Sequence, residues 1–222
     1  MVKVENIEVF NFEGAIRGMR NPLNSWEKSD SSYTPAVDYK LGEKIKHNFR
    51  IGEKDLALMR RLYKGGTEHR KFMRQIMVSM DITCNHFWWA EFDTYKVGVT
   101  RNSCSKMHKV HIKEFVPDDF SHEGLTEVGG EFLEHFEETL ATLERLRVLF
   151  NETGEKKYWR ALLELLPMGY NIKATITMNY ENAASIIRQR KNHKVFEWND
   201  FCYVLRTQLP YLEEIINEKG EN

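Results

Sequence analysis

The stretch that decides the fold is "LPMGYNIKATITMNYENAASIIRQR", residues 166–190. It opens with a Leu-Pro break, after which residues 170–178 alternate between apolar and polar side chains and include several β-branched ones. This alternation predicts a half-buried strand. Asn179 follows, and a short run with helical spacing ends at Arg190. The block therefore predicts a strand, an asparagine and a helix in direct succession.

The arginines that end this predicted helix have two interpretations. Arg188 and Arg190 lie two positions apart, so only one of them should point toward a given ligand. Cations in a last helical turn also complement the helix dipole, which explains them without any ligand. His193 and Lys194 follow directly. The block either positions donors on a ligand or forms core scaffolding with a solvated end.

The rest of the chain mixes helices and strands. The spacing of apolar side chains predicts strands at 2–12 and 75–84, helices at 53–63, 85–95, 126–150, 158–166 and 197–219, and loops at 20–50 and 97–107. Asn85 is a candidate N-cap of the helix that follows it, and Pro210 interrupts the last helix. Because the order shows no regular βαβ alternation, we predict an α+β fold.

Composition limits the function classes. The chain has 222 residues, 41% of them hydrophobic, which suits one domain over 1–222 with residues 20–50 as a long loop or excursion within it. A formal net charge of -1 argues against a nucleic-acid partner. Three cysteines without a CxxC pair fit a reducing cytoplasm. Neither a signal peptide nor an apolar run of membrane-spanning length is present, so we expect no membrane association.

On chemistry alone, the best candidate site is the loop "RNSCSKMHK", residues 101–109. It combines cations, an amide, hydroxyls and a thiol, and such groups suit a phosphate. The alternative is a solvated surface loop. Cys104 is a candidate nucleophile if Lys106 favours its thiolate, and otherwise a small buried residue.

Other motifs carry less chemistry. The histidines form no HExxH or Cys/His framework, so we expect no metal. There is no GxGxxG or GxxxxGK[ST] segment. Trp88 and Trp89, with Phe87 and Phe92, are more typical of a core than of a surface that stacks on a flat cofactor.

The opening block resembles the C-terminal part of the flavin-dependent thymidylate synthases. That family has an LP, an asparagine twelve residues after the proline and an arginine eleven residues after that, and here Pro167, Asn179 and Arg190 keep both spacings. In the same register His69 falls where the family has a histidine near the flavin. The resemblance spans roughly residues 53–215.

The family signature RHRxxSxNExSxR is the main departure. Without gaps it meets "TYKVGVTRNSCSK", residues 94–106. Cys104 then stands for the second serine and Lys106 for the last arginine. A shift by one residue would instead place Asn102 on the asparagine and Ser105 on that serine. Both registers stay open.

Single positions outside the signature also depart from the family. Glu91 stands where a glutamine is usual, and Glu181 where an arginine contacts the flavin. Leu163 replaces a phosphate-binding arginine, although Arg160 lies about one helical turn away.

By resemblance the chain is a ThyX-like homotetramer, with an antiparallel sheet flanked by helices, a long helical segment in the middle and active sites between subunits. FAD, NADPH and methylenetetrahydrofolate would then convert dUMP to dTMP. Arg190 would hold the uracil ring as the catalytic residue. Further substrate contacts would come from Glu91, Ser103, Cys104, Ser105, Lys106 and Arg160. The flavin would be faced by His69, Tyr95, Lys96, Arg101, Asn102 and Asn179.

Three functional hypotheses follow. The first is a divergent flavin-dependent thymidylate synthase. The second is a related flavin or nucleotide enzyme, such as one that hydroxymethylates dUMP, which the replacement of Arg-His-Arg by Thr94-Tyr95-Lys96 favours. The third is a non-catalytic nucleotide binder or oligomeric scaffold, which the missing arginines at positions 94 and 181 favour.

Overall fold

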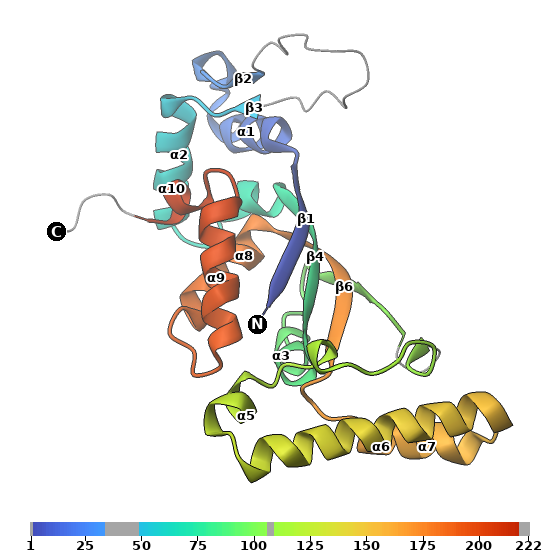
Figure 1. Ribbon diagram of the computed structural model, residues 1–222. Helices are drawn as coiled ribbons and strands as arrows, with labels where there is room; N and C mark the ends of the chain where they lie inside the picture. The colour runs from blue at the N-terminus through green and yellow to red at the C-terminus, as the bar shows by residue number, and fades with distance from the viewer. Residues whose placement is uncertain (1, 34–48, 106–108, 218–222) are drawn as a thin grey trace, which may run out of the picture.

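An antiparallel sheet organises the fold, as seen in a computed structural model that describes residues 2–33, 49–105 and 109–217. Its strand order is β1-β4-β6-β5 (Figure 1). The strands are β1 Lys3–Phe10, β4 Met77–Asn85, β5 Thr100–Ser103 and β6 Asn171–Asn179. The strand predicted from the opening block is therefore an inner strand, paired with β4 along its whole length.

Helices pack against one face of this sheet, and a helical hairpin lies past one of its ends (Figure 1). They are α1 Phe12–Arg20, α2 Glu53–Lys64, α3 His86–Phe92, α5 Glu123–Val128, α6 Glu131–Thr153, α7 Lys156–Leu165, α8 Tyr180–Arg190, α9 Phe196–Gln208 and α10 Leu212–Ile216. Short 3-10 turns are η1 Asn21–Leu23, η2 Trp26–Lys28, η3 Arg70–Arg74 and η4 Pro117–Asp119, and β2 Ser32–Tyr33 pairs with β3 Phe49–Arg50. The predicted α+β class with an antiparallel sheet is confirmed. None of the described helices has the length and hydropathy needed to cross a lipid bilayer.

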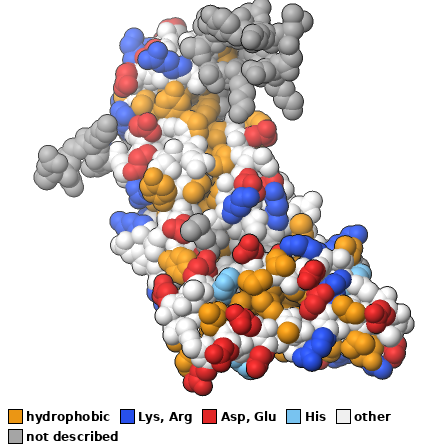
Figure 2. Space-filling view, viewed as in Figure 1, with side chains coloured by type: hydrophobic (Ala, Val, Ile, Leu, Met, Phe, Trp, Pro, Cys, Tyr) orange, Lys and Arg blue, Asp and Glu red, His pale blue; other side chains and the backbone are white. Residues whose placement is uncertain are grey.

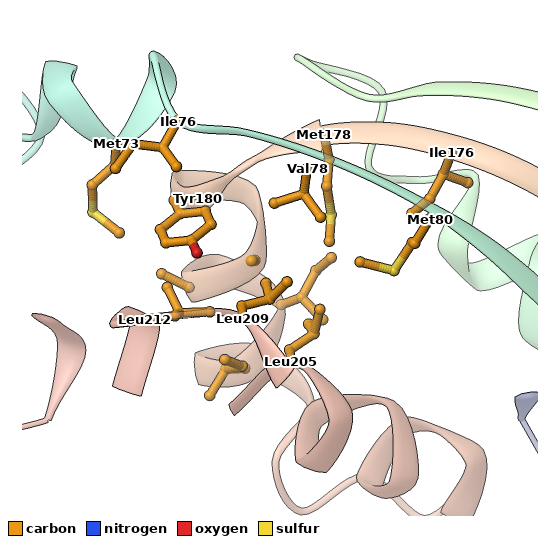
Figure 3. Packing of buried hydrophobic residues seen from close by; sticks show 14 of the residues in the cluster. Met73, Ile76, Val78, Met80, Ile176, Met178, Tyr180, Leu205, Leu209 and Leu212 are labelled. Atoms are coloured by element: carbon orange, nitrogen blue, oxygen red, sulfur yellow. The ribbon is translucent and has the colours of Figure 1, made fainter. Parts of the chain in front are cut away.

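One face of the sheet forms the main core. Alternating residues of β4 and β6, such as Val78 and Met178, are fully buried, as period-two alternation requires. Figure 3 shows them facing Leu205 of α9, with Tyr180 beside them over Leu212 of α10. The Tyr180 hydroxyl donates to the carbonyl of Pro210 at 2.8 Å, which satisfies its polar group inside the core.

Both inner strands pass directly into a helix through an asparagine. The Asn85 side chain accepts the Trp88 N–H at 2.9 Å, and the Asn179 side chain accepts the Asn182 N–H at 3.0 Å. Each asparagine thus satisfies one of the free donors at a helix start. The predicted N-cap at Asn85 is confirmed. Asn85 also donates to the buried carboxylate of Glu197 at 2.6 Å, which ties α3 to α9.

A second, smaller hydrophobic cluster lies under α6 and α7. Its buried members are Val110, Phe115, Phe120, Phe136, Leu140, Leu143 and Leu162. Tyr170 packs against this cluster and the main core. Figure 2 shows hydrophobic side chains interspersed with acidic ones over this end of the molecule.

Several sequence predictions need correction. Residues 100–103, predicted as loop, form the edge strand β5, because β6 supplies hydrogen bonds that a local pattern does not show. The helix predicted over 126–150 is broken at Gly129 and Gly130, both at positive φ. Phe132, which was predicted to lie on the apolar stripe, is in the first turn of α6 and is 55% exposed.

The N-terminal predictions also change. The strand predicted over 2–12 ends at Phe10, and residues 12–20 form a helix that was not predicted. The predicted loop over 20–50 contains the turns η1 and η2 and the β2–β3 pair where it is described, and residues 34–48 lie outside the described part.

A buried ion pair joins the start of the segment 20–50 to α2. Arg20 donates from Nε to Oδ1 of Asp55 at 2.7 Å, and Asp55 is fully buried. Its Oδ2 accepts the hydroxyls of Ser29 and Ser31 at 2.6 and 2.7 Å. Asp30, between these serines, accepts the Lys54 and Asp55 N–H groups at the start of α2.

Candidate functional site

Arg190, in the last turn of α8, is the centre of the candidate site. Its Nη1 donates to Oε2 of Glu91 at 2.6 Å, and its Nε donates to the Tyr95 hydroxyl at 3.0 Å. The guanidinium carbon lies 4.6 Å from the centroid of the Trp198 ring. A planar cation over an aromatic face is a favourable arrangement. The Arg190 side chain is 18% exposed, so it is largely sheltered and still reachable.

Glu91 gathers the neighbouring donors. The same Oε2 accepts the Trp198 indole N–H at 2.9 Å. Nε2 of His193 lies 3.5 Å from this oxygen and 2.9 Å from Nη1 of Arg190, so the tautomer of the ring decides which group it bonds. Nδ1 of His193 faces the Val195 N–H at 3.2 Å. Because Nδ1 accepts from Val195, the proton of the neutral ring lies on Nε2, the nitrogen near both Glu91 and Arg190.

Rigid packing positions this cluster. Glu91 belongs to α3, whose other face buries Trp88, Trp89 and Phe92 in the main core. These rings are core residues, as their spacing predicted. Because α3 and α8 are held by this core, the carboxylate and the guanidinium meet without a flexible loop between them.

The turn after α3 runs along α8. Tyr95 donates to Gln189 near the C-terminal end of that helix at 3.1 Å, and Asn182 near its N-terminal end donates to the carbonyl of Val97 at 2.9 Å. Gly98, at φ +74°, follows, and a Cβ there would lie 2.9 Å from Nδ2 of Asn179. The Tyr95 hydroxyl and Asn179 therefore lie near opposite ends of α8.

Of the other residues predicted to face a flavin, Asn179 caps the N-terminal end of α8 and His69 borders an element that packs against this helix. His69 directly precedes η3, which packs against α8. Arg74 of η3 forms an ion pair with Glu181 in the first turn of α8. The resemblance implies an arginine at position 181 itself. Here a cation stands beside that position, but it is Arg74 from η3. Lys96 is exposed.

The residues of β5 lie along the edge of the sheet. Arg101 forms an ion pair with Asp93 at 2.9 Å and lies over the Trp89 ring at 4.7 Å. Asn102 and Ser103 are exposed and follow toward the α3 end. Ser103 pairs with Ala174, five residues before Asn179, which places them about 17 Å apart along the strand.

The remaining phosphate candidates stand apart from Arg190. Cys104 and Ser105 continue past β5, and the Cys104 N–H donates to the carbonyl of Lys173 at 3.0 Å. Lys106 lies outside the described residues. Arg160 forms an exposed ion pair with Glu164 on α7, in the helical hairpin at the end of the molecule (Figure 1). No contact in the described part of the chain joins Arg160 to Arg190.

Comparison with solved structures adds a fold relationship. A crystal structure of thymidylate synthase X (ThyX) from Helicobacter pylori with FAD and dUMP superposes with a TM-score of 0.67 at 17% sequence identity, over 98% of each chain. A second structure of the Helicobacter pylori enzyme, also complexed with FAD and dUMP, gives a TM-score of 0.66 at 17% identity, over 97% of this chain and 98% of that one.

The chain has the ThyX fold. No family model matches its sequence, and no curated protein does either. At this identity the relationship covers the fold alone, so the site must be argued from its own residues.

Sequence reasoning missed two residues that contact predicted positions on α8 and α3. Trp198 was predicted only as part of a helix, and its spacing gave no sign that its indole meets Glu91 and Arg190. Arg74 was not considered, because its partner Glu181 is 107 positions away. Both contacts are non-local, and only the packing of α8 against η3 and α9 creates them.

Two other features bear on the assignment. Residues 2–33, 49–105 and 109–217 contain no group of three or more His, Cys, Asp or Glu side chains that could hold a metal ion. A broad open hollow of about 1830 Å³ runs along β1 and α1 and is lined by Phe10, Tyr33 and Phe49 among others. It includes none of the predicted site residues, so we place the candidate site at Arg190, where polar groups converge.

Proposed function

We propose that this chain is a divergent flavin-dependent enzyme of the ThyX type, which adds a one-carbon unit to a pyrimidine deoxynucleotide in a reducing cytoplasm. The observation that carries the proposal is the position of Arg190. Its guanidinium is held between Tyr95, Glu91 and Trp198 at the end of the helix that, by resemblance, holds the pyrimidine. In the same proposal, methylenetetrahydrofolate donates the carbon and NADPH supplies the electrons that reduce it.

The chain's own residues would bind and polarise the ring. Nη1 and Nε of Arg190 are used by protein partners, and no partner is found for Nη2 among the described residues. That N–H group can donate to a ring carbonyl and stabilise negative charge that develops there. Trp198 and Tyr95 fix the plane of the guanidinium. The side chain therefore loses little conformational freedom when the nucleotide binds.

The donor set near the N-terminal end of α8 fits a flavin dinucleotide. The η3 segment contributes Arg70, Lys71 and Arg74 after His69, and these cations suit a pyrophosphate. The Asn179 oxygen is used as a helix cap, which leaves its amide N–H₂ available as a donor beside Gly98. When bound, a flavin would supply the hydride for the reductive step.

Oligomerisation stays part of the proposal. Ser103, Cys104, Ser105 and Lys106 would hold the nucleotide phosphate, and Arg160 would join them from another subunit of a homotetramer. The exposed ion pair of Arg160 with Glu164 is worth little, so it would not prevent such a role.

Flavin binding is the first prediction. The purified chain is expected to retain a yellow flavin, or to acquire one after incubation with FAD and removal of the free cofactor, because cations and amide donors remain near α8. Visible absorption measures it. A protein that stays colourless would instead favour the non-catalytic alternative, in which the Arg74–Glu181 ion pair closes the flavin site.

Loss of nucleotide affinity in Arg190→Ala is the second prediction. Without the charged donor, dUMP or dCMP is expected to bind more weakly by about 1.5–3 kcal/mol, as measured by isothermal titration calorimetry. Arg188→Ala is the matched control, because Arg188 is exposed on the same helix and, among the described residues, its guanidinium hydrogen-bonds only Ser185. Equal affinities in the folded Arg190→Ala variant and the wild type would contradict the assignment.

A further inference from the structure

Trp198 joins the aromatic core of the protein to the candidate site. Its side chain is fully buried, and its ring centroid lies 4.8 Å from that of Trp88 and 6.3 Å from that of Phe92. The edge of the ring donates its indole N–H to Oε2 of Glu91 at 2.9 Å. The face of the ring lies against Arg190, whose guanidinium carbon is 4.6 Å from the ring centroid. One side chain therefore contacts both members of the Glu91–Arg190 ion pair.

The ion pair is partly open to water, which limits how firmly it can hold Arg190 by itself. The Glu91 side chain is 35% exposed, so water competes for its carboxylate and the side chain has other rotamers to adopt. The indole N–H belongs to a ring that the core keeps from turning. Its hydrogen bond to a charged oxygen therefore favours the Glu91 rotamer whose Oε2 also accepts from Nη1 of Arg190.

We propose that Trp198 is a positioning residue, which keeps Arg190 in place for the nucleotide by holding the Glu91 carboxylate through the indole N–H. This inference rests on the proposed function, since it assumes that Arg190 binds the nucleotide. The edge and the face of the ring have tasks that a substitution can separate. Trp198→Phe keeps an aromatic face for the guanidinium, but it has no N–H for Glu91.

Trp88 supplies a matched control for the smaller ring. It is fully buried in the same aromatic cluster, and its indole N–H has no hydrogen-bond partner among the described residues. Trp88→Phe therefore removes the same atoms from the same core without taking a donor from the ion pair. Both variants are expected to lose stability through poorer packing. Only Trp198→Phe is expected to raise the Kd for dUMP, by about tenfold in isothermal titration calorimetry.

A second measurement follows the hydrogen bond itself. The chain has five tryptophans, so NMR spectra of protein with isotope-labelled tryptophan contain few indole N–H signals. Glu91→Ala is expected to move one of them to a lower proton chemical shift, because that indole loses its charged acceptor. The signal that moves should be the one absent from Trp198→Phe. In the double variant Trp198→Phe, Glu91→Ala, the Kd should equal that of Glu91→Ala alone, since Trp198 acts through Glu91.

The outcomes separate the positioning role from the proposed function. Equal dUMP affinity in folded Trp198→Phe and the wild type overturns the positioning role and leaves the proposed function standing. Equal losses of affinity in Trp198→Phe and Trp88→Phe overturn it as well, because packing alone then explains them. Indole signals that do not move in Glu91→Ala also overturn it, so the test stands even if Trp198→Phe does not fold. Absence of nucleotide binding by the wild type overturns the proposed function, and the positioning role with it.

Discussion

Asp55→Ala is expected to lower the free energy of unfolding by about 3–5 kcal/mol, because it leaves the buried guanidinium of Arg20 without a counter-ion. Arg20 is 5% exposed and Asp55 is fully buried, so water cannot replace the lost partner. The same substitution removes the acceptor of the Ser29 and Ser31 hydroxyls. Chemical denaturation monitored by circular dichroism measures the change.

Two further variants test whether the loss of stability comes from the broken Arg20–Asp55 ion pair or from any substitution in α2. Glu53→Ala lies in the same first helical turn but is exposed, so its loss should stay below about 1 kcal/mol. The double variant Arg20→Met, Asp55→Leu removes both charges and should be less destabilised than Asp55→Ala. Equal losses in Asp55→Ala and Glu53→Ala would show that the ion pair does not hold the segment.

The same carboxylate predicts a response to acid. Burial raises the pKa of Asp55, but hydrogen bonds from Ser29, Ser31 and Arg20 outweigh it, and the net pKa is lowered. Its stabilising contribution is therefore complete above the unfolded value, near 3.8, and is lost as the pH falls through the lower folded value. Asp55→Asn should lack this part of the acid-induced loss.

The sequence predicted the centre of the fold because local patterns determine it. β4 and β6 alternate between apolar and polar residues, and their buried faces follow that alternation. Asn85 and Asn179 each mark the change from strand to helix, since their side chains can cap the helix that follows. These signals depend on neighbours in the sequence, so they can be recognised without a structure.

The elements that were missed depend on distant partners. β5 has only four residues, and its strand conformation comes from pairing with β6 across about seventy positions. The sequence carries no signal that pairs the buried side chains of Arg20 and Asp55, because only folding brings them together. For the candidate site, the family resemblance pointed to Arg190, whereas its contacts to Glu91 and Trp198 required the packing of α3, α8 and α9.

Phe92→Ala is expected to cost about 3–5 kcal/mol of the free energy of unfolding, because it opens a cavity in the aromatic core beneath the candidate site. Phe92 is 1% exposed. Its ring stacks on Trp88 at 5.1 Å between centroids and on Trp198 at 6.3 Å, and it lies 6.2 Å from Tyr95. The lost contacts are therefore those that support the two rings flanking Arg190.

Phe87, on the same helix, supplies the matched control. It is 37% exposed, so Phe87→Ala removes much less buried area and should cost below about 1.5 kcal/mol. Both variants are compared by denaturant midpoint, and nucleotide binding is then measured under conditions where each is folded. If Arg190 depends on the aromatic core for its orientation, Phe92→Ala will also bind nucleotide more weakly, and Phe87→Ala will not. Normal binding by a destabilised but folded Phe92→Ala protein would show that Glu91 and Tyr95 orient Arg190 without support from the rings below.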